Sequence, residues 1–328
     1  MKMMFYTLRP FDELSFCEKY SREYGIDFVW TDKGPNTRTI PMAEGCDAVC
    51  TNPCDMSKPV LDAFAAYGIK YLPCRSIGYD HIDLAHAKEL GMRVSNSGYP
   101  PQGVANYAVM LMLLCTRKMK QIMLRAHAQD YSLKGKMGRD LSGCTVGVIG
   151  TGNIGRTVLK SLSGFGCRLI AYDIYQNEAA GQCAEYVDLD TLYAQSDVIT
   201  LHTNATLENH HLLDSAAFAK MKDGVLLINT ARGSLIDTTA LLDALESGKV
   251  GGAGLDVIED EAGLYYANLS DRVLKNREMA LLASYPNVIL SPHTAFYTDV
   301  NVENMVKGAF ESAHFFATGA ENPHEIKL

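Results

Sequence analysis

The chain has 328 residues, a formal net charge of −8 and a hydrophobic share of 47%. At roughly 150 residues per domain, this length predicts about two domains with ordinary globular cores. The acidic balance argues against nucleic-acid binding, which depends on Lys and Arg neutralising phosphates. No apolar run approaches the roughly 18 residues that a membrane span needs, and the apolar stretch after Lys2 is too short for a signal peptide. We therefore expect a soluble, cytoplasmic protein that binds neither nucleic acid nor membrane.

The first hundred residues alternate short apolar runs with amphipathic stretches. The runs predict strands at residues 3–8, 48–50, 70–73 and 92–94, and the stretches between them predict helices at 11–24, 59–67 and 84–90. Strands that alternate with helices are typical of βαβ units and a parallel sheet. Pro100-Pro101 is the strongest break in this half, and a long apolar helix is expected at 104–120.

A second βαβ series begins near Cys144. Continuous apolar runs predict strands at 145–149, 169–172, 198–201, 225–229, 252–257 and 288–290, with helices at 154–162, 214–219 and 239–245. Such runs suit strands of a parallel sheet that is covered on both faces. Residues 298–328 predict one helix and a tail, which are too few to bury a core alone. We expect this segment to pack against a domain built earlier in the chain.

A glycine-rich turn stands between the strand at 145–149 and the helix that follows. It reads Gly150-Thr151-Gly152-Asn153-Ile154-Gly155, a GxGxxG motif in the strand–turn–helix context that dinucleotide binding requires. Asp173 ends the next strand, 18 residues after Gly155. A carboxylate there accepts hydrogen bonds from the ribose hydroxyls of NAD and repels a 2′-phosphate. The motif, its flanks and the acid together predict an NAD site, against the alternative of a glycine turn without a ligand.

Three further strands of this half are followed by polar residues. Arg232 follows the strand at 225–229, and His293 follows the strand at 288–290. The strand between them carries Asp256 at its end, with Glu259, Asp260 and Glu261 just after it. Ligands of doubly wound sheets bind outside the carboxyl ends of the strands. Arginine suits a bidentate grip on a carboxylate, and histidine exchanges a proton near neutral pH. The alternatives are a surface ion pair for Arg232 and a structural role for His293.

The nine cysteines do not form a recognisable metal or disulfide pattern. Their number is odd, no CxxC pair occurs, and no paired histidine spacing completes a zinc site. Cys46, Cys50 and Cys54 are expected on a strand that runs into a loop rather than on one helix face. We therefore predict reduced structural thiols and no metal.

Taken together, these residues resemble the D-2-hydroxyacid dehydrogenases, especially the D-lactate and D-2-hydroxyisocaproate dehydrogenase branch. Besides the turn, the resemblance rests on the runs 75–83, 229–233, 254–257 and 292–297. It implies an α/β fold of two doubly wound parallel-sheet domains, with a Rossmann-type NAD-binding domain (99–295) inserted into a flavodoxin-like substrate domain (1–98 and 296–328). It also implies a homodimer formed through the cofactor domain, with the helix near 104–114 as an interface element.

The resemblance assigns a role to each site residue. Arg232 would bind the carboxylate and carbonyl of the substrate, His293 would transfer the proton, and Glu261 would pair with His293, with Glu259 and Asp260 as neighbouring alternatives. Beside Gly150, Gly152, Gly155 and Asp173, the expected cofactor contacts are Thr151, Asn153, Ile154, His202, Thr203, Asn204, Thr230, Ala231 and Asp256. The expected substrate contacts are Ser76, Ile77, Gly78, Tyr79, Tyr99 and Phe296. Two positions depart from the family pattern: Asn204 replaces a usual proline, and Tyr79 replaces a small apolar residue.

The implied reaction is reduction of a 2-keto acid by NADH to an (R)-2-hydroxy acid. Pyruvate is favoured as the substrate, because Tyr79, Tyr99, Phe296 and Tyr297 predict a narrow aromatic pocket. The same rings leave open a branched substrate, as in D-2-hydroxyisocaproate dehydrogenases, or an aromatic, phenyllactate-type one. A distant alternative is an NADH-sensing binding protein of the same fold. A phosphorylated substrate is not expected, because the run 75–83 has one Arg and no Lys.

Overall fold

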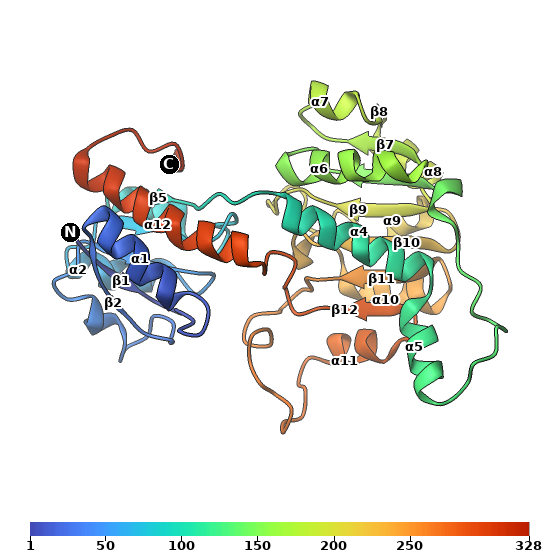
Figure 1. Cartoon of the computed structure of the whole chain (residues 1–328), viewed down its shortest axis with the longest axis horizontal. Helices are drawn as coiled ribbons and strands as arrows, with labels where there is room; N and C mark the ends of the chain where they lie inside the picture. The colour runs from blue at the N-terminus through green and yellow to red at the C-terminus, as the bar shows by residue number, and fades with distance from the viewer. Residues whose placement is uncertain (328) are drawn as a thin grey trace. The chain divides into compact units, whose positions relative to one another are not determined.

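The computed structural model describes residues 1–327 and separates them into two compact units (Figure 1). The first unit comprises residues 1–100 and the residues from Tyr297 onward, and the second comprises residues 101–296. The chain therefore leaves the first unit, builds the whole of the second, and returns. The predicted boundaries, at 98/99 and 295/296, lie within two residues of these divisions.

The first unit is built on a five-stranded parallel sheet in the order β2-β1-β3-β4-β5. This is the strand order of flavodoxin-like folds. Its strands are β1 (Lys2–Phe5), β2 (Asp27–Trp30), β3 (Ala48–Cys50), β4 (Tyr71–Pro73) and β5 (Arg93–Ser95). Its helices are α1 (Leu14–Tyr24), α2 (Lys58–Ala66), α3 (Leu84–Glu89) and the C-terminal α12 (Asp299–Thr318), with a short 3-10 turn at Ile40–Ala43.

Helix α12 completes the core of this first unit. Val306 and Phe310 of α12 are fully buried in one cluster with Phe5 of β1 and Cys17 of α1. The rings of Phe5 and Phe310 lie 5.3 Å apart between centroids. A C-terminal segment too short to form its own core thus fills the core of a unit that the N-terminal residues begin, as its length predicts.

Strand β2 (Asp27–Trp30) was not predicted from the sequence. It lies at the edge of the sheet and pairs only with β1. Asp27 and Trp30 are exposed, and no residue of the strand is fully buried. An edge strand is paired on only one side, and its faces are partly exposed to solvent. Its apolar run, Phe28-Val29-Trp30, is as long as that of β3, so the sequence analysis missed this strand although a short apolar signal is present.

The second unit contains a seven-stranded parallel sheet in the order β12-β11-β10-β9-β6-β7-β8. Its strands are β6 (Thr145–Ile149), β7 (Arg168–Tyr172), β8 (Glu185–Tyr186), β9 (Val198–Leu201), β10 (Val225–Asn229), β11 (Val250–Leu255) and β12 (Val288–Leu290). Its helices are α4 (Gln102–Thr116), α5 (Met119–His127), α6 (Asn153–Leu162), α7 (Glu178–Gly181), α8 (Leu189–Gln195), α9 (Ser215–Lys220), α10 (Thr238–Glu246) and α11 (Arg277–Ser284). Short 3-10 turns lie at Leu141–Gly143, Ser163–Phe165 and Gly233–Leu235.

The strand order of this sheet reverses direction between β6 and β9. From β6 the chain adds β7 and β8 on one side, and from β9 it adds β10, β11 and β12 on the other. Every strand pair is parallel, so the carboxyl ends of all seven strands lie at one edge. This is the doubly wound order in which a ligand binds at the reversal point. The two parallel-sheet α/β domains predicted from the sequence are confirmed.

The prediction of one long helix at 104–120 was wrong. Helix α4 ends at Thr116, Lys118 adopts a left-handed backbone (φ 52°), and α5 starts at Met119. The amide of Arg139 donates to the carbonyl of Thr116 at 2.8 Å, which replaces a bond that a continuing helix would make. The carbonyl at the end of α4 is therefore bound by a residue 23 positions further along the chain, a contact that the local apolar pattern cannot predict.

All nine cysteines are free thiols, as expected, and Cys50 ends strand β3. Six of them are buried. Among residues 1–327, no helix combines the length and apolarity that crossing a bilayer would require.

Candidate active site

The glycine turn follows β6 directly and leads into helix α6. Gly150 has a φ of +92°, and a Cβ there would lie 2.6 Å from the backbone of His202. A Cβ on Gly155 would lie 1.9 Å from the carbonyl oxygen of Gly150, so the helix approaches the strand at van der Waals contact. A Cβ on Gly152, by contrast, would meet no atom within 4 Å. The space beside Gly152 is therefore open, as a pyrophosphate that contacts the backbone needs.

Helix α6 begins beside this open space without a side-chain cap. Its N-cap is Gly152, and no side chain accepts a hydrogen bond from its first amides. The helices α8, α9, α10 and α11 are each capped by an Asp or Asn side chain. The uncapped N–H groups and the positive end of the helix dipole can thus face an anion.

Asp173 lies at the turn, just after β7. Its Oδ2 accepts hydrogen bonds from the amide of Thr151 at 2.6 Å and from the hydroxyl of Thr151 at 3.0 Å. Tyr186 of β8 donates its hydroxyl to the same Thr151 oxygen at 2.7 Å. The carboxylate is thereby held beside the glycines, which is the position that recognition of a ribose requires.

Two buried polar atoms at neighbouring strand ends have no hydrogen-bond partner within residues 1–327. They are Nδ1 of His202, after β9, and Oγ1 of Thr230, after β10. Burial lowers the pKa of His202 to about 3, so its ring is neutral at physiological pH. Buried polar groups normally have partners. Two such atoms and a glycine cradle fit a polar ligand at this edge.

The other predicted cofactor residues lie along the same edge. Thr203 and Asn204 follow His202, and the carbonyl of Asn204 accepts a hydrogen bond from the side chain of Asn209 at 2.7 Å. Asn153 and Ile154 start helix α6. The amide of Ala231 donates to the side chain of Asn229.

Arg232 follows β10 and has an extended backbone. The loop that carries it is held by Asn229, a residue to which the sequence analysis gave no role. Asn229, fully buried, donates from Nδ2 to the carbonyl of Arg232 at 2.8 Å and accepts from the amide of Ala231 at 2.9 Å. A Cβ on Gly233 would lie 2.0 Å from the backbone of Ile258, so the arginine loop packs tightly on the loop after β11. Arg232 itself is half-buried and donates to the Ala231 carbonyl.

His293 and Glu261 form a hydrogen-bonded pair. Nδ1 of His293 lies 2.6 Å from Oε1 of Glu261, and both side chains are about three-quarters buried. The other Glu261 oxygen accepts from the amide of Ile258 at 3.3 Å. Of the three neighbouring acids, Glu261 is the one hydrogen-bonded to His293, whereas Glu259 is hydrogen-bonded to His211. A carboxylate on Nδ1 orients the ring, and the other ring nitrogen, Nε2, is not used by this contact.

The backbone at His293 is unusual for a non-glycine residue, with a φ of 51°. Its amide donates to the carbonyl of Asp256 at 2.8 Å, and its carbonyl accepts from the hydroxyl of Tyr266 at 2.8 Å. Left-handed backbone at a non-glycine residue costs energy and persists where surrounding contacts enforce it. Tyr266 was not recognised from the sequence, because it lies in an irregular segment far from any motif.

Asp256 is fully buried at the end of β11 and holds the histidine loop. Its Oδ1 accepts from the hydroxyl of Ser291 at 2.7 Å and the amide of Thr294 at 2.9 Å, and its Oδ2 accepts from the amide of Ala295 at 2.8 Å. These donors flank His293 on both sides. The carboxylate thus fixes the course of the loop, and a direct contact with the cofactor stays a prediction.

The predicted substrate residues lie mainly in the first unit. The run from Ser76 to Tyr79 follows β4, and it is held by hydrogen bonds from the side chain of Asn96 to the carbonyl of Ile77 and from the amide of Ser97 to the carbonyl of Ser76. Tyr99 follows β5 and is half-buried. Phe296 is the last residue of the second unit, and its ring lies edge-on to that of His293, 6.2 Å between centroids.

Arg75, which begins this run, does not point into the loop. It is fully buried, with Nε 3.1 Å from Oε1 of Glu13 and Nη2 donating to the carbonyl of Tyr6. Its guanidinium lies 5.2 Å from the ring centroid of Phe5. The single arginine of the run is thus a core residue, and the absence of a phosphorylated substrate stays a prediction.

The sheet brings the site residues of the second unit together. The residues that would bind a dinucleotide follow β6, β7 and β9, and Arg232, Glu261 and His293 follow the adjacent strands β10, β11 and β12. A dinucleotide turn beside an arginine and a carboxylate-paired histidine defines an NAD-dependent dehydrogenase that acts on a carboxylate-bearing substrate.

The comparisons with known proteins agree with this class. Residues 109–295, more than half of the chain, match the family model described as D-isomer specific 2-hydroxyacid dehydrogenase, NAD binding domain. An aromatic 2-oxoacid reductase of Clostridium sporogenes is 41% identical over 94% of this chain and 93% of its own length. The D-lactate dehydrogenase of Escherichia coli is 37% identical over 99% of this chain and 100% of its own length. A solved D-lactate dehydrogenase of Treponema pallidum superposes with a TM-score of 0.88 at 32% identity, over 100% of both chains.

The chain therefore belongs to the D-2-hydroxyacid dehydrogenase family, in the branch of the D-lactate dehydrogenases. It is an NAD-dependent oxidoreductase, as the glycine turn and Asp173 predict. These relatives confirm the family, the enzyme class and the cofactor. They differ in the 2-keto acid that their names give.

Proposed function

We propose that this enzyme reduces pyruvate to (R)-lactate, with His293 and Glu261 as its acid–base pair and Arg232 as its anion-binding residue. The observation that carries the acid–base assignment is the 2.6 Å contact between Glu261 and Nδ1 of His293. It leaves Nε2 as the ring nitrogen available to a substrate oxygen. A proton donor held in this way, beside an arginine suited to a carboxylate, matches the needs of 2-keto acid reduction.

The chain's residues would act as follows. The guanidinium of Arg232 holds the substrate carboxylate and polarises the keto group, so that negative charge on the oxygen is stabilised as it develops. NADH, when bound, supplies the hydride to C2. His293 donates its proton from Nε2 to the oxygen, and Glu261 stabilises the imidazolium before the transfer and fixes the ring that carries it.

We assign the loop 76–79 of the first unit to substrate binding. Within residues 1–327, no hydrogen bond leads from the amides of Ile77 and Gly78 to another group, and their neighbours hold the loop from its carbonyl side. Two such N–H groups suit a carboxylate. On this assignment, residues 1–98 and 296–328 act as the substrate domain and 99–295 as the cofactor domain.

Pyruvate is proposed because the expected substrate contacts Tyr79, Tyr99 and Phe296 are aromatic, which favours a small substrate side chain. The ring of Tyr79 is half-buried and packs against the core of the first unit. An aromatic 2-keto acid is the second candidate, because a 41% identical relative is an aromatic 2-oxoacid reductase. A single methylene changes discrimination by only about 1–3 kcal/mol, so the residues alone do not decide between these substrates.

The deciding experiment compares kcat/KM for pyruvate, 2-ketoisocaproate and phenylpyruvate, with the oxidation of NADH as the measured signal. We expect pyruvate to have the highest value and the product to be the (R) enantiomer by chiral chromatography. A higher value for phenylpyruvate would replace pyruvate by the aromatic candidate. No NADH oxidation with any keto acid would instead favour a binding protein of the same fold.

We also propose a homodimer. An apolar groove on the second unit is lined by Val109, Met110 and Leu113 of α4 and by Phe165, and Met110 is 40% exposed. A groove of this kind is typical of a surface that another protein covers. Sedimentation at micromolar concentration should give a dimer. The nine free thiols fit the reducing cytoplasm, which we keep as the expected compartment.

A further inference from the structure

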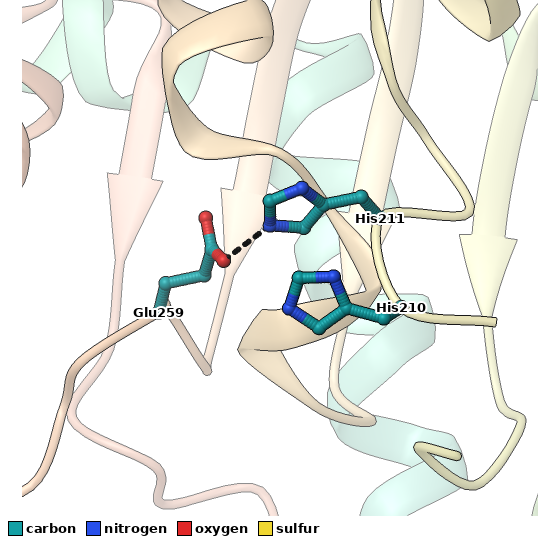
Figure 2. A group of neighbouring side chains, drawn as sticks. All are labelled: His210, His211 and Glu259. Carbon is teal, nitrogen blue, oxygen red and sulfur yellow. Dashed lines mark hydrogen bonds and ion pairs between the residues drawn. The ribbon is translucent and has the colours of Figure 1, made fainter. Parts of the chain in front are cut away.

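A pair of histidines and a glutamate meet at the active-site edge of the second unit, outside the machinery described above. His210 and His211 lie between β9 and α9, and Glu259 follows β11 (Figure 2). One ligand atom from each of the three lies within 4.8 Å of the others. The two imidazole rings are stacked, with centroids 3.9 Å apart, and Nε2 of His211 lies 2.6 Å from Oε1 of Glu259.

Other residues hold Glu259 so that one carboxylate oxygen faces the histidines. Its Oε2 accepts from the amide of Thr238 at 2.9 Å and from the hydroxyl of Thr238 at 2.7 Å. Oε1 is left to the imidazoles. A carboxylate fixed on one oxygen is the support that metal ligands commonly receive from their surroundings.

His211 is positioned as firmly. Its backbone is left-handed, with a φ of 53°, and its amide donates to the carbonyl of Ser234 at 2.9 Å. Its Nδ1 lies 3.8 Å from Oδ2 of Asp237, whereas Nε2 points to Glu259. A carboxylate near one ring nitrogen favours the tautomer that keeps the other nitrogen as a ligand.

We propose that His210, His211 and Glu259 bind one divalent transition-metal ion of the Zn²⁺ type, with solvent completing the coordination. Two imidazoles and one carboxylate are a recurrent zinc donor set, and nitrogen ligands favour Zn²⁺, Co²⁺ or Ni²⁺ over Mg²⁺ and Ca²⁺. A tetrahedral ion with ligands at about 2.0–2.1 Å separates them by about 3.3 Å. His210 is exposed, so its ring can rotate toward the ion, and the 2.6 Å hydrogen bond between His211 and Glu259 has to open to that spacing when the ion binds.

An ion pair alone does not account for this arrangement. Glu259 is already satisfied by Thr238 and His211, and His210 adds a second imidazole stacked on the first. Two stacked imidazoles repel each other when both are protonated, whereas a shared cation makes their proximity favourable. The three residues do not form a recognisable metal-binding motif in the sequence, because Glu259 lies 48 residues from His211.

The proposed ion would join loops that also carry active-site residues, without touching the reacting atoms. Glu259 stands two residues before Glu261, and the Ser234 that binds the amide of His211 stands two residues after Arg232. Metal binding should therefore stabilise these loops. It is independent of which 2-keto acid the enzyme reduces.

The test uses the full-length protein, first treated with a chelator and then titrated with Co²⁺ as a spectroscopic substitute for Zn²⁺. The variants are His210→Ala and Glu259→Gln, and the matched control is His127→Ala, an exposed histidine of α5. We expect the wild type and the control to bind one equivalent, with visible d–d bands and without a strong thiolate charge-transfer band. Zn²⁺ should displace the Co²⁺, and each site variant should lose at least tenfold in affinity.

Circular dichroism of each variant separates loss of a ligand from loss of the fold. The exposed His210 can be removed with little effect on folding, so His210→Ala keeps the test valid even if Glu259→Gln unfolds. Absence of saturable one-equivalent binding by the wild type would overturn the proposal. So would equal affinity in His210→Ala and His127→Ala, or a thiolate band showing that the cysteines bind the ion.

Discussion

Replacing Asp256 by asparagine should both destabilise the second unit and slow the reaction. The substitution keeps the shape of the side chain and removes its charge, and it turns one accepting oxygen into a donating amide. In the native protein the fully buried carboxylate accepts from Ser291, Thr294 and Ala295. An asparagine can keep its oxygen toward Ser291 and Thr294, but its NH₂ group then faces the N–H of Ala295.

The magnitude follows from these contacts. One hydrogen bond to a charged group, about 1.5–3 kcal/mol, is lost, and the buried N–H of Ala295 is left without an acceptor at about 1–3 kcal/mol. Removal of a buried charge offsets part of this loss, because the neutral amide is cheaper to desolvate. We expect the free energy of unfolding to fall by about 2–4 kcal/mol. We expect kcat to fall at least about tenfold, because the loop that carries His293 is no longer held in place.

Urea denaturation followed by far-ultraviolet circular dichroism is the suitable assay. The only tryptophan, Trp30, lies in the first unit, so its fluorescence does not report on the second. With two units the transition need not be two-state, and the phase that responds to the substitution identifies the second unit. Asp260→Asn is the matched control, because Asp260 is exposed and asparagine tolerates its left-handed backbone (φ 53°).

The control should keep its stability within about 0.5 kcal/mol. If Asp256→Asn unfolded at the same urea concentration as the control and kept kcat within about twofold of the wild type, the buried carboxylate would not be holding the histidine loop. The reasoning from hydrogen bonds to catalysis would then be wrong.

Three further substitutions test the site. His293→Gln should lower kcat by about 10²–10⁴-fold with the fold intact by circular dichroism, and near-native turnover would remove His293 from the acid–base role. Arg232→Lys should raise the KM of the keto acid and lower kcat together in steady-state assays, because lysine lacks the planar fork, and an unchanged KM would contradict the assignment. Gly155→Ala places a Cβ 1.9 Å from the Gly150 carbonyl. It should lower the free energy of unfolding, measured by chemical denaturation, by about 3 kcal/mol or more. It should also weaken the binding of NADH, measured by fluorescence titration. Gly164→Ala, whose Cβ meets nothing within 4 Å, should be nearly neutral, and equal effects of the two alanines would refute the packing argument.

Structural features that depend on consecutive residues were predictable from the sequence. The central strands are near-continuous apolar runs because both faces of a parallel sheet are covered, and the glycine turn is local because a strand, a tight turn and a helix must follow one another. Asp173 and His293 were identified because each ends or follows such a strand. From these elements the fold class, the cofactor and the family follow.

Features that depend on contact between distant segments were decided by the tertiary structure alone. The residue pattern alone does not separate Glu259, Asp260 and Glu261, and only the family resemblance favours Glu261 as the partner of His293. In the structure, the packing of the β11 and β12 loops puts Glu261 on His293 and Glu259 on His211. In the same way, the helix expected at 104–120 ends at Thr116, whose carbonyl is bound by a later segment. Hydrogen-bond partners far apart in the chain leave no periodic signal, since each is selected by the position of its strand in the sheet.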